Sequence, residues 1–274
     1  MQFRSISRTV TIPLALSLAC LAPLSVQAQT PDDELKYELT VYGWFPAIGG
    51  ETSFPTGSGS NINVSSDQVI DALQFAFMGN FGVKKGVWGA WTDLVYSSFG
   101  ASKSGTRDFS IGQHALPANL NADLSLDIKS WIWTLAGTYE LAKSKDFSAD
   151  FLVGARLLDM QQTLDWSLQG DLGQVSGIGR SGSVDADINV WDGVVGVKGN
   201  AYLGDERKWF IPYYFDIGTG QSDLTWQVNA GIGYQYDWGA LVATWRYLDY
   251  EFSSDKAVQS VNFNGPTIGA TFKW

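Results

Sequence analysis

The feature that most constrains this sequence is a two-residue alternation of apolar and polar side chains that recurs along most of the chain. It is clearest from Leu224 to Tyr236, where every second residue is apolar or aromatic and the intervening residues are polar or glycine. Successive side chains of a β-strand point to opposite faces of the sheet, so the pattern predicts strands with one apolar face. Aromatic residues near both ends of that face are typical of a strand that crosses a bilayer.

The same alternation predicts how many strands there are. Further segments begin near Leu35, Gln74, Val87, Trp131, Phe147, Trp191, Trp209, Ala240 and Phe263. Each is about as long as a tilted membrane-crossing strand. We therefore predict an all-β fold, an antiparallel transmembrane β-barrel of ten strands with both termini on the periplasmic side. Counts of eight and twelve remain open, because residues 48–54 and 61–64 can pair as an external hairpin.

Connection lengths support the same topology. The links at residues 84–86, 142–146, 204–208 and 237–239 are short, and they alternate with long links at 46–73, 98–126 and 166–184. Short periplasmic turns and long external loops are typical of a bacterial outer-membrane barrel.

The N-terminus predicts export. Arg4 and Arg8 precede an apolar run at 12–24, and the small-x-small sequence at 26–28 forms a cleavage site. We predict a signal peptide over 1–28, an outer-membrane barrel over 29–274, and the outer membrane of a Gram-negative bacterium as the location. Lipidation at Cys20 is the weaker alternative, because Ser17 and Leu18 fit a lipidation box poorly. The net charge of −10 argues against nucleic acid as a partner.

We call the strand positions that alternate with the apolar ones the inward parity, because their side chains should face the lumen. This set of positions carries charged residues of both signs. It contains Lys36, Glu38, Lys84, Asp93, Glu140, Asp150, Arg156, Asp192, Lys198, Asp216, Arg246 and Lys273. The candidates for a charge cluster in mid-barrel are Asp93, Arg156, Asp192, Asp216 and Arg246. Such a cluster acts either as a polar constriction that selects a small solute or as a network of ion pairs that fills the lumen. Ten strands lie near the filled end of the range of barrel sizes, which favours the second interpretation.

Residues 65–73, in the first long link, predict a short helix. Ser65 and Gln68 have capping-box spacing, and Val69, Ile70 and Leu73 form a small apolar face. The helix is either a lid or plug over the barrel mouth or, as we favour, a loop helix packed against the rim. At the other end of the chain, Phe272 and Trp274 form the predicted insertion signal for the barrel-insertion machinery.

Catalytic and metal-binding patterns are weak. His114 is the only histidine and lies in a long external link, with no spacing that places a serine and an acid beside it. The pairs Asp185/Asp187 and Asp32/Asp33 belong to no complete calcium loop. We expect no catalytic residue, no metal and no cofactor.

Several short sequence motifs carry a resemblance to a known family. They are Trp191-Asp192, Asp216-Ile217-Gly218, Ser222-Asp223, Trp226-Gln227, Trp245-Arg246-Tyr247-Leu248-Asp249-Tyr250 and Gly265-Pro266. In this order the chain resembles a widespread family of Gram-negative outer-membrane β-barrel proteins, and the resemblance covers most of the residues after the signal peptide. It implies the barrel fold and the location, and it implies no reaction or substrate.

The expected function is therefore that of a non-enzymatic, monomeric outer-membrane barrel with a structural or surface role and limited, porin-like passage of small solutes. Its expected partners are outer-membrane lipid and lipopolysaccharide. One alternative is a narrow selective channel or transporter. The second is a membrane-embedded hydrolase or lipid-modifying enzyme that depends on His114.

Overall fold

The computed structural model describes residues 34–52, 60–105, 110–111, 114–115, 120–172, 175–253 and 258–274. The predicted signal peptide and Cys20 lie outside these ranges, so both remain predictions. Within these ranges, no helix is long and apolar enough to cross a membrane.

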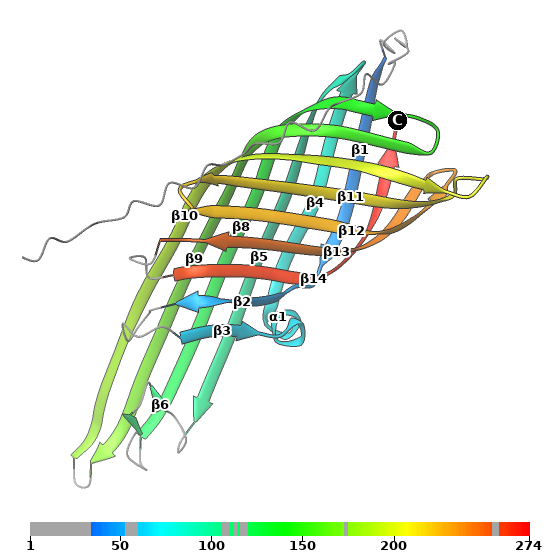
Figure 1. The fold of residues 1–274 in the computed structure, drawn as a ribbon. Helices are drawn as coiled ribbons and strands as arrows, with labels where there is room; N and C mark the ends of the chain where they lie inside the picture. Colours follow the sequence, from blue (N-terminus) through cyan, green and yellow to red (C-terminus); the bar gives the residue numbers. More distant parts are fainter. Residues whose placement is uncertain are drawn as a thin grey trace, which may run out of the picture. The chain divides into compact units, whose positions relative to one another are not determined.

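Ten antiparallel strands close into a barrel, as the alternation predicts (Figure 1). They are β1 (Leu35–Trp44), β4 (Leu73–Lys85), β5 (Trp88–Gly105), β8 (Leu120–Lys143), β9 (Phe147–Leu172), β10 (Val175–Leu203), β11 (Trp209–Gly220), β12 (Leu224–Tyr236), β13 (Gly239–Glu251) and β14 (Val258–Lys273). Each strand pairs with the next in this order, and β14 returns to pair with β1, with Glu38 opposite Lys273 and Trp44 opposite Thr267. The closure leaves the membrane-crossing part of the sheet without an open edge.

A hairpin of β2 (Ala47–Thr52) and β3 (Ser60–Val64) adds to the part of β14 that extends past β1. This is the external hairpin that leaves the strand count uncertain in the sequence. It lies outside the ring that β1 and β14 close, so the barrel count stays at ten. A separate two-stranded ribbon, β6 (Ser110–Ile111) with β7 (His114–Ala115), lies in the next long link.

The short helix α1 (Ser66–Ala72) follows β3 and has the predicted capping box, in which the Ser65 and Gln68 side chains bond each other's backbone N–H. Val69 is buried, at 6% exposure, and the helix contacts β2 and β5. The prediction of one apolar face is wrong for Ile70, which is 46% exposed, and Leu73 is the capping residue that begins β4. A seven-residue helix lying on the rim buries only one narrow stripe, which Val69 occupies.

Four short turns join the strands at one end of the barrel, between β4 and β5, β8 and β9, β10 and β11, and β12 and β13. Gly86 and Gly204 adopt φ angles of 60° and 71° there, which glycine tolerates without steric strain. The C-terminus lies at the same end, where the backbone of Trp274 exchanges hydrogen bonds with that of Tyr37. By the convention of outer-membrane barrels this is the periplasmic end.

The outer surface of the barrel is apolar and is bordered by aromatic pairs. Near the turns, Trp88 packs on Tyr139 with ring centroids 4.7 Å apart. Toward the opposite end, Tyr96 packs on Trp131 at 4.4 Å. Aliphatic side chains between these borders stay exposed, among them Val41, Leu135, Val153, Val195, Ile232 and Ile268. Exposed aliphatic residues between two aromatic belts form a lipid-facing surface.

Strands β8, β9 and β10 are 24, 26 and 29 residues long, whereas about 9–11 residues cross a bilayer. The prediction of loops over 98–126 and 166–184 is therefore wrong for most of these residues, which continue β5, β8, β9 and β10 as a sheet beyond the barrel (Figure 1). These residues lie between the alternating segments with an apolar face, but the paired strands satisfy each other's backbone hydrogen bonds outside the membrane.

The outward face of this sheet changes character where it leaves the barrel. On β10 the exposed outward residues within the barrel include Trp191 and Val195, and beyond it they include Asp185 and Asp187. On β8 the same change occurs between Trp131 and Asp127. Acidic side chains do not face hydrocarbon, so the external edge of the membrane lies near the two tryptophans.

Candidate functional site

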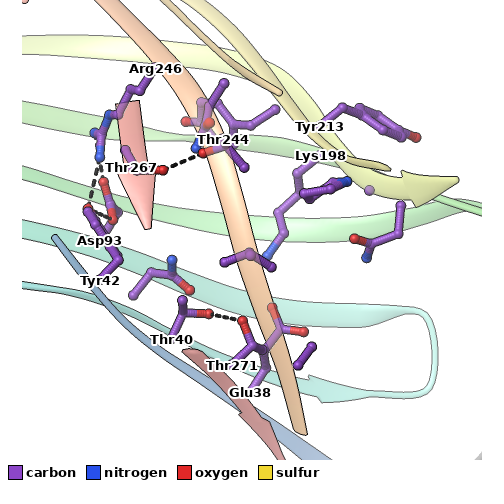
Figure 2. A pocket seen from close by; sticks show the side chains of 18 of the residues that line it. Glu38, Thr40, Tyr42, Asp93, Lys198, Tyr213, Thr244, Arg246, Thr267 and Thr271 are labelled. Carbon is purple, nitrogen blue, oxygen red and sulfur yellow. Dashed lines mark hydrogen bonds and ion pairs between the residues drawn. The ribbon is translucent and has the colours of Figure 1, made fainter. Parts of the chain in front are cut away.

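The inward parity of the barrel strands builds a charged belt, and its first half is an ion pair between β13 and β5. Arg246 Nη2 donates to Asp93 Oδ2 at 2.8 Å, and the two side chains are only 3% and 4% exposed. Tyr42, on β1, donates to Asp93 Oδ1 at 2.6 Å and accepts from Arg246 Nη1 at 2.8 Å (Figure 2). The guanidinium also donates to Gln227 Oε1 at 2.9 Å and lies 4.5 Å from the centroid of the Trp44 ring.

The second half of the belt is an ion pair between β9 and β11. The side chains of Arg156 and Asp216 are completely buried, and Tyr214 donates to the same carboxylate oxygen that Arg156 contacts. Arg156 Nε donates to Thr134 Oγ1 at 3.1 Å. Removing one partner of such a pair leaves an uncompensated buried charge, which costs about 3–5 kcal/mol.

Gly196 on β10 explains how Asp216 reaches across an intervening strand. Asp216 lies directly opposite Gly196 in the ladder of β10 and β11. A Cβ at position 196 would lie 2.7 Å from Asp216 Cβ and 2.1 Å from the carbonyl oxygen of Phe215. A side chain there would occupy the space that the aspartate uses.

Asp192 is buried but belongs to a different arrangement. It lies opposite Arg156 in the ladder of β9 and β10, yet its carboxylate accepts from the N–H and the hydroxyl of Ser222, both at 2.8 Å. Ser222 is in the external turn between β11 and β12. The structure therefore brings four of the five predicted cluster residues into two ion pairs. The fifth, Asp192, lies on β10 and binds the external turn between β11 and β12.

An apolar layer lies on the external side of the charged belt. On β13, Leu248 and Tyr250 follow Arg246 in the external direction, and on β9 Leu158 follows Arg156; all three are completely buried. The layer consists of Trp44, Met78, Val95, Ile132, Leu158, Met160, Val190, Leu248, Tyr250, Phe252, Val261 and Phe263. It packs across the lumen as a continuous cluster, so the described side chains fill the external half of the barrel.

On the periplasmic side of the belt the lumen contains a cavity of about 140 Å³ (Figure 2). The Arg246–Asp93 pair, Tyr42 and Trp91 line it toward the belt, and Glu38 and Lys273 line it toward the periplasmic end. Glu38 and Lys273 are 3.2 Å apart, and their side chains are 33% and 43% exposed. The increase in exposure along the lining shows that the cavity opens toward the periplasm.

Further predicted inward residues lie near this opening. Lys84 forms ion pairs with Glu140 at 2.6 Å and with Asp150 at 2.7 Å. Lys198 lines the cavity and lies over the Trp91 ring, 5.0 Å from its centroid. Lys36 is exposed at the start of β1, at the periplasmic rim.

Parity places Tyr214 in the lumen, but sequence reasoning did not identify the uncharged groups that organise the two ion pairs. Tyr42, Thr134 and Tyr214 each contribute a hydroxyl to the belt, and Ser222 binds Asp192. The inward parity of their strands points to the first three, because each alternates with lipid-facing neighbours. Ser222-Asp223 is among the motifs that carry the family resemblance, but the contact of Ser222 with Asp192 depends on the position of a turn and could not be read from the sequence.

Sites for catalysis or metal have less geometric support. Within the described ranges, no group of three His, Cys, Asp or Glu residues is placed to hold a metal ion. His114 has a described backbone in β7, and the orientation of its side chain is not described. The predicted insertion signal lies at the periplasmic end, where the Trp274 ring stacks on Tyr37 at 5.8 Å and Phe272 packs on Trp238 at 5.5 Å.

No protein-family model and no curated protein matches the chain. Among solved structures, the chain is similar to the outer membrane protease OmpT from Escherichia coli, with 9% identity, coverage of 90% of this chain and 99% of that one, and a TM-score of 0.44. The translocator domain of autotransporter NalP from Neisseria meningitidis has 14% identity, 88% coverage of each chain and a TM-score of 0.39. Ail of Yersinia pestis has 9% identity, coverage of 88% and 99%, and a TM-score of 0.31.

These TM-scores are all below 0.5, so the location of the protein follows from its own geometry. The strands form a closed antiparallel barrel with short turns at one end, an apolar outer surface and aromatic residues along both edges of that surface. Only a closed barrel lets β-strands cross hydrocarbon with every backbone group paired, and such barrels are built into bacterial outer membranes. The chain is an integral β-barrel protein of the Gram-negative outer membrane.

Proposed function

We propose that the protein is a closed, non-enzymatic barrel that anchors an extended β-sheet at the cell surface. The observation that carries this proposal is the filling of the lumen by the charged belt and the apolar layer. Arg156, Arg246, Leu158 and Leu248 are each at most 2% exposed, so a hydrated ion has no path between them without a rearrangement of the core. The four charges of the belt serve as structural groups, because each is bonded to its partner in an ion pair.

The sheet beyond the barrel supports the surface role. β8, β9 and β10 continue for about as many residues outside the membrane as inside it, and Asp127, Asp185 and Asp187 are exposed on the outward face. A barrel with no role outside the membrane would not require this external sheet. Its acidic face suits contact with cations that bridge to lipopolysaccharide phosphate groups or with a basic partner.

Single-channel recording in planar bilayers tests the closed lumen. The wild-type protein is expected to give no discrete openings. The double variant Trp44→Ala/Phe263→Ala removes two buried rings that pack at 5.9 Å, and it is expected to conduct. Trp245→Ala is the matched control, because Trp245 is 56% exposed on the lipid face and its loss should leave the barrel closed. Ion-selective openings of the wild-type protein that change selectivity in Arg246→Ala would contradict the proposal and favour a channel.

Thiol labelling tests the surface sheet. Ser183→Cys lies in the extension of β10, and the control Ser144→Cys lies in a periplasmic turn; both positions are exposed. The chain's natural cysteine, Cys20, is in the predicted signal peptide. An impermeant maleimide should label Ser183→Cys on intact cells and Ser144→Cys only after the outer membrane is permeabilised. The reverse pattern would refute the orientation of the barrel.

The proposal that the protein has no enzymatic activity is tested separately. His114→Ala should leave the lipid composition of the outer membrane and the proteolysis of surface proteins unchanged. A change in either would support the hydrolase or lipid-modifying alternative.

A further inference from the structure

The periplasmic cavity contains a charge that its own walls do not balance. Its lining includes five charged residues among those the structure describes: Glu38, Asp93, Lys198, Arg246 and Lys273. Arg246 is paired with Asp93, and Lys273 is paired with Glu38. Lys198 is left over, so the lining has a formal charge of +1.

Lys198 has no ion-pair partner within 4 Å among the described residues, although an acid is close to it in the sheet. Asp150 lies directly opposite Lys198 in the ladder of β9 and β10, but the Asp150 carboxylate accepts from Lys84 at 2.7 Å. The Lys198 ammonium lies instead 5.0 Å from the centroid of the Trp91 ring. A cation–π contact of this kind satisfies only part of the bonding capacity of an ammonium, which has three N–H donors.

Figure 2 shows the Lys198 side chain extending into the cavity from β10. Aromatic and apolar groups cover part of the lining: the Trp91 and Tyr214 rings are 5.3 Å apart, and Phe210 and Val242 also line the cavity. Polar groups with spare capacity line the rest, including Asn229 Oδ1 and Arg246 Nε, which are buried without a hydrogen-bond partner in the described part of the chain. A cavity of about 150 Å³ with apolar walls is large enough for a benzene ring.

From these observations we propose that the periplasmic half of the lumen is a binding site for a small aromatic monocarboxylate of about the size of benzoate. The carboxylate pairs with the Lys198 ammonium, and the ring packs against Trp91 and Tyr214. The ligand enters from the periplasm past Glu38 and Lys273, because the Arg246–Asp93 pair closes the other end. This site does not depend on the proposed surface role, since it requires only the lumen geometry.

The test uses the full barrel refolded in detergent micelles, with benzoate as the probe and ligand-observed NMR or calorimetry as the readout. Benzoate should bind saturably, and benzyl alcohol, which keeps the ring and lacks the charge, should bind at least about tenfold more weakly; a tenfold change corresponds to about 1.4 kcal/mol. Equal affinities would overturn the proposal, because partition into micelles or apolar packing alone would then explain the signal. Absence of saturable benzoate binding would overturn it as well.

Two substitutions locate the site. Lys198→Met should lower benzoate affinity at least about tenfold and reduce the preference over benzyl alcohol, whereas Val242→Phe should block both ligands by filling the cavity. Lys208→Met is the matched control, since Lys208 lies in a periplasmic turn, is exposed and pairs with Glu206 at 3.0 Å. Unchanged binding in Lys198→Met would refute the assignment. If Lys198→Met does not fold, as judged by heat-modifiable migration on gels, Lys198→Arg keeps the charge and should retain the preference for benzoate; loss of that preference would refute the role of the charge.

Discussion

The buried pair of Arg156 and Asp216 allows a quantitative test of how the lumen holds the barrel together. Arg156→Met leaves the Asp216 carboxylate in a site with no exposure, and Asp216→Leu leaves the guanidinium there. Each single substitution should lower the free energy of unfolding by about 3–5 kcal/mol, the usual cost of an uncompensated buried charge. The double variant removes both charges and leaves the Thr134 and Tyr214 hydroxyls without their partners, which costs about 1–3 kcal/mol.

The double variant is therefore expected to be more stable than either single variant. The free energies come from reversible unfolding in lipid vesicles with guanidinium, followed by tryptophan fluorescence and by heat-modifiable migration on gels. Asp146→Asn is the control, because it breaks an ion pair with Arg207 at 2.9 Å whose side chains are 65% and 39% exposed. Such a surface pair contributes about 0–1 kcal/mol.

The outcome that refutes this reasoning is additivity. If the two single losses sum to the loss of the double variant, the side chains do not act as a pair. Single losses no larger than that of Asp146→Asn would show that water reaches Arg156, and the lumen would then not be closed at this level.

The structure makes two further stability predictions. Gly196→Ala should lower the free energy of unfolding by about 1–3 kcal/mol, because the added Cβ meets Asp216 Cβ at 2.7 Å and the Phe215 carbonyl at 2.1 Å. Gly137→Ala is its control, since the nearest atom to a Cβ there is 4.0 Å away; equal losses in guanidinium titrations would contradict the account. Trp274→Ser should slow membrane insertion, because it removes the ring that stacks on Tyr37 where β1 and β14 close the barrel, and a time course of heat-modifiable migration measures the rate. Wild-type insertion kinetics in this variant would argue against Trp274 as part of the insertion signal.

The alternation along the chain was sufficient to predict the elements of the barrel. β12 has the predicted bounds, Leu224–Tyr236, and the ten strands and the four short turns follow the predicted order. The reason is local: a strand with lipid on one side and a filled lumen on the other must change environment at every residue. The extension of β8, β9 and β10 was missed, because outside the membrane polar strands and polar loops have similar compositions.

The sequence also determined which residues face the lumen, since parity assigns Asp93, Arg156, Asp216 and Arg246 to the inner face before any contact is known. Only the tertiary structure decided which of them meet. Register alone places Asp192 opposite Arg156, yet Arg156 binds Asp216 two strands away, because Gly196 leaves the space over β10 open and Ser222 engages Asp192. Which charged side chains pair inside a closed barrel depends on the curvature of the sheet and on the volume of the side chains between them. The curvature and the space inside the barrel are fixed only when β14 pairs with β1.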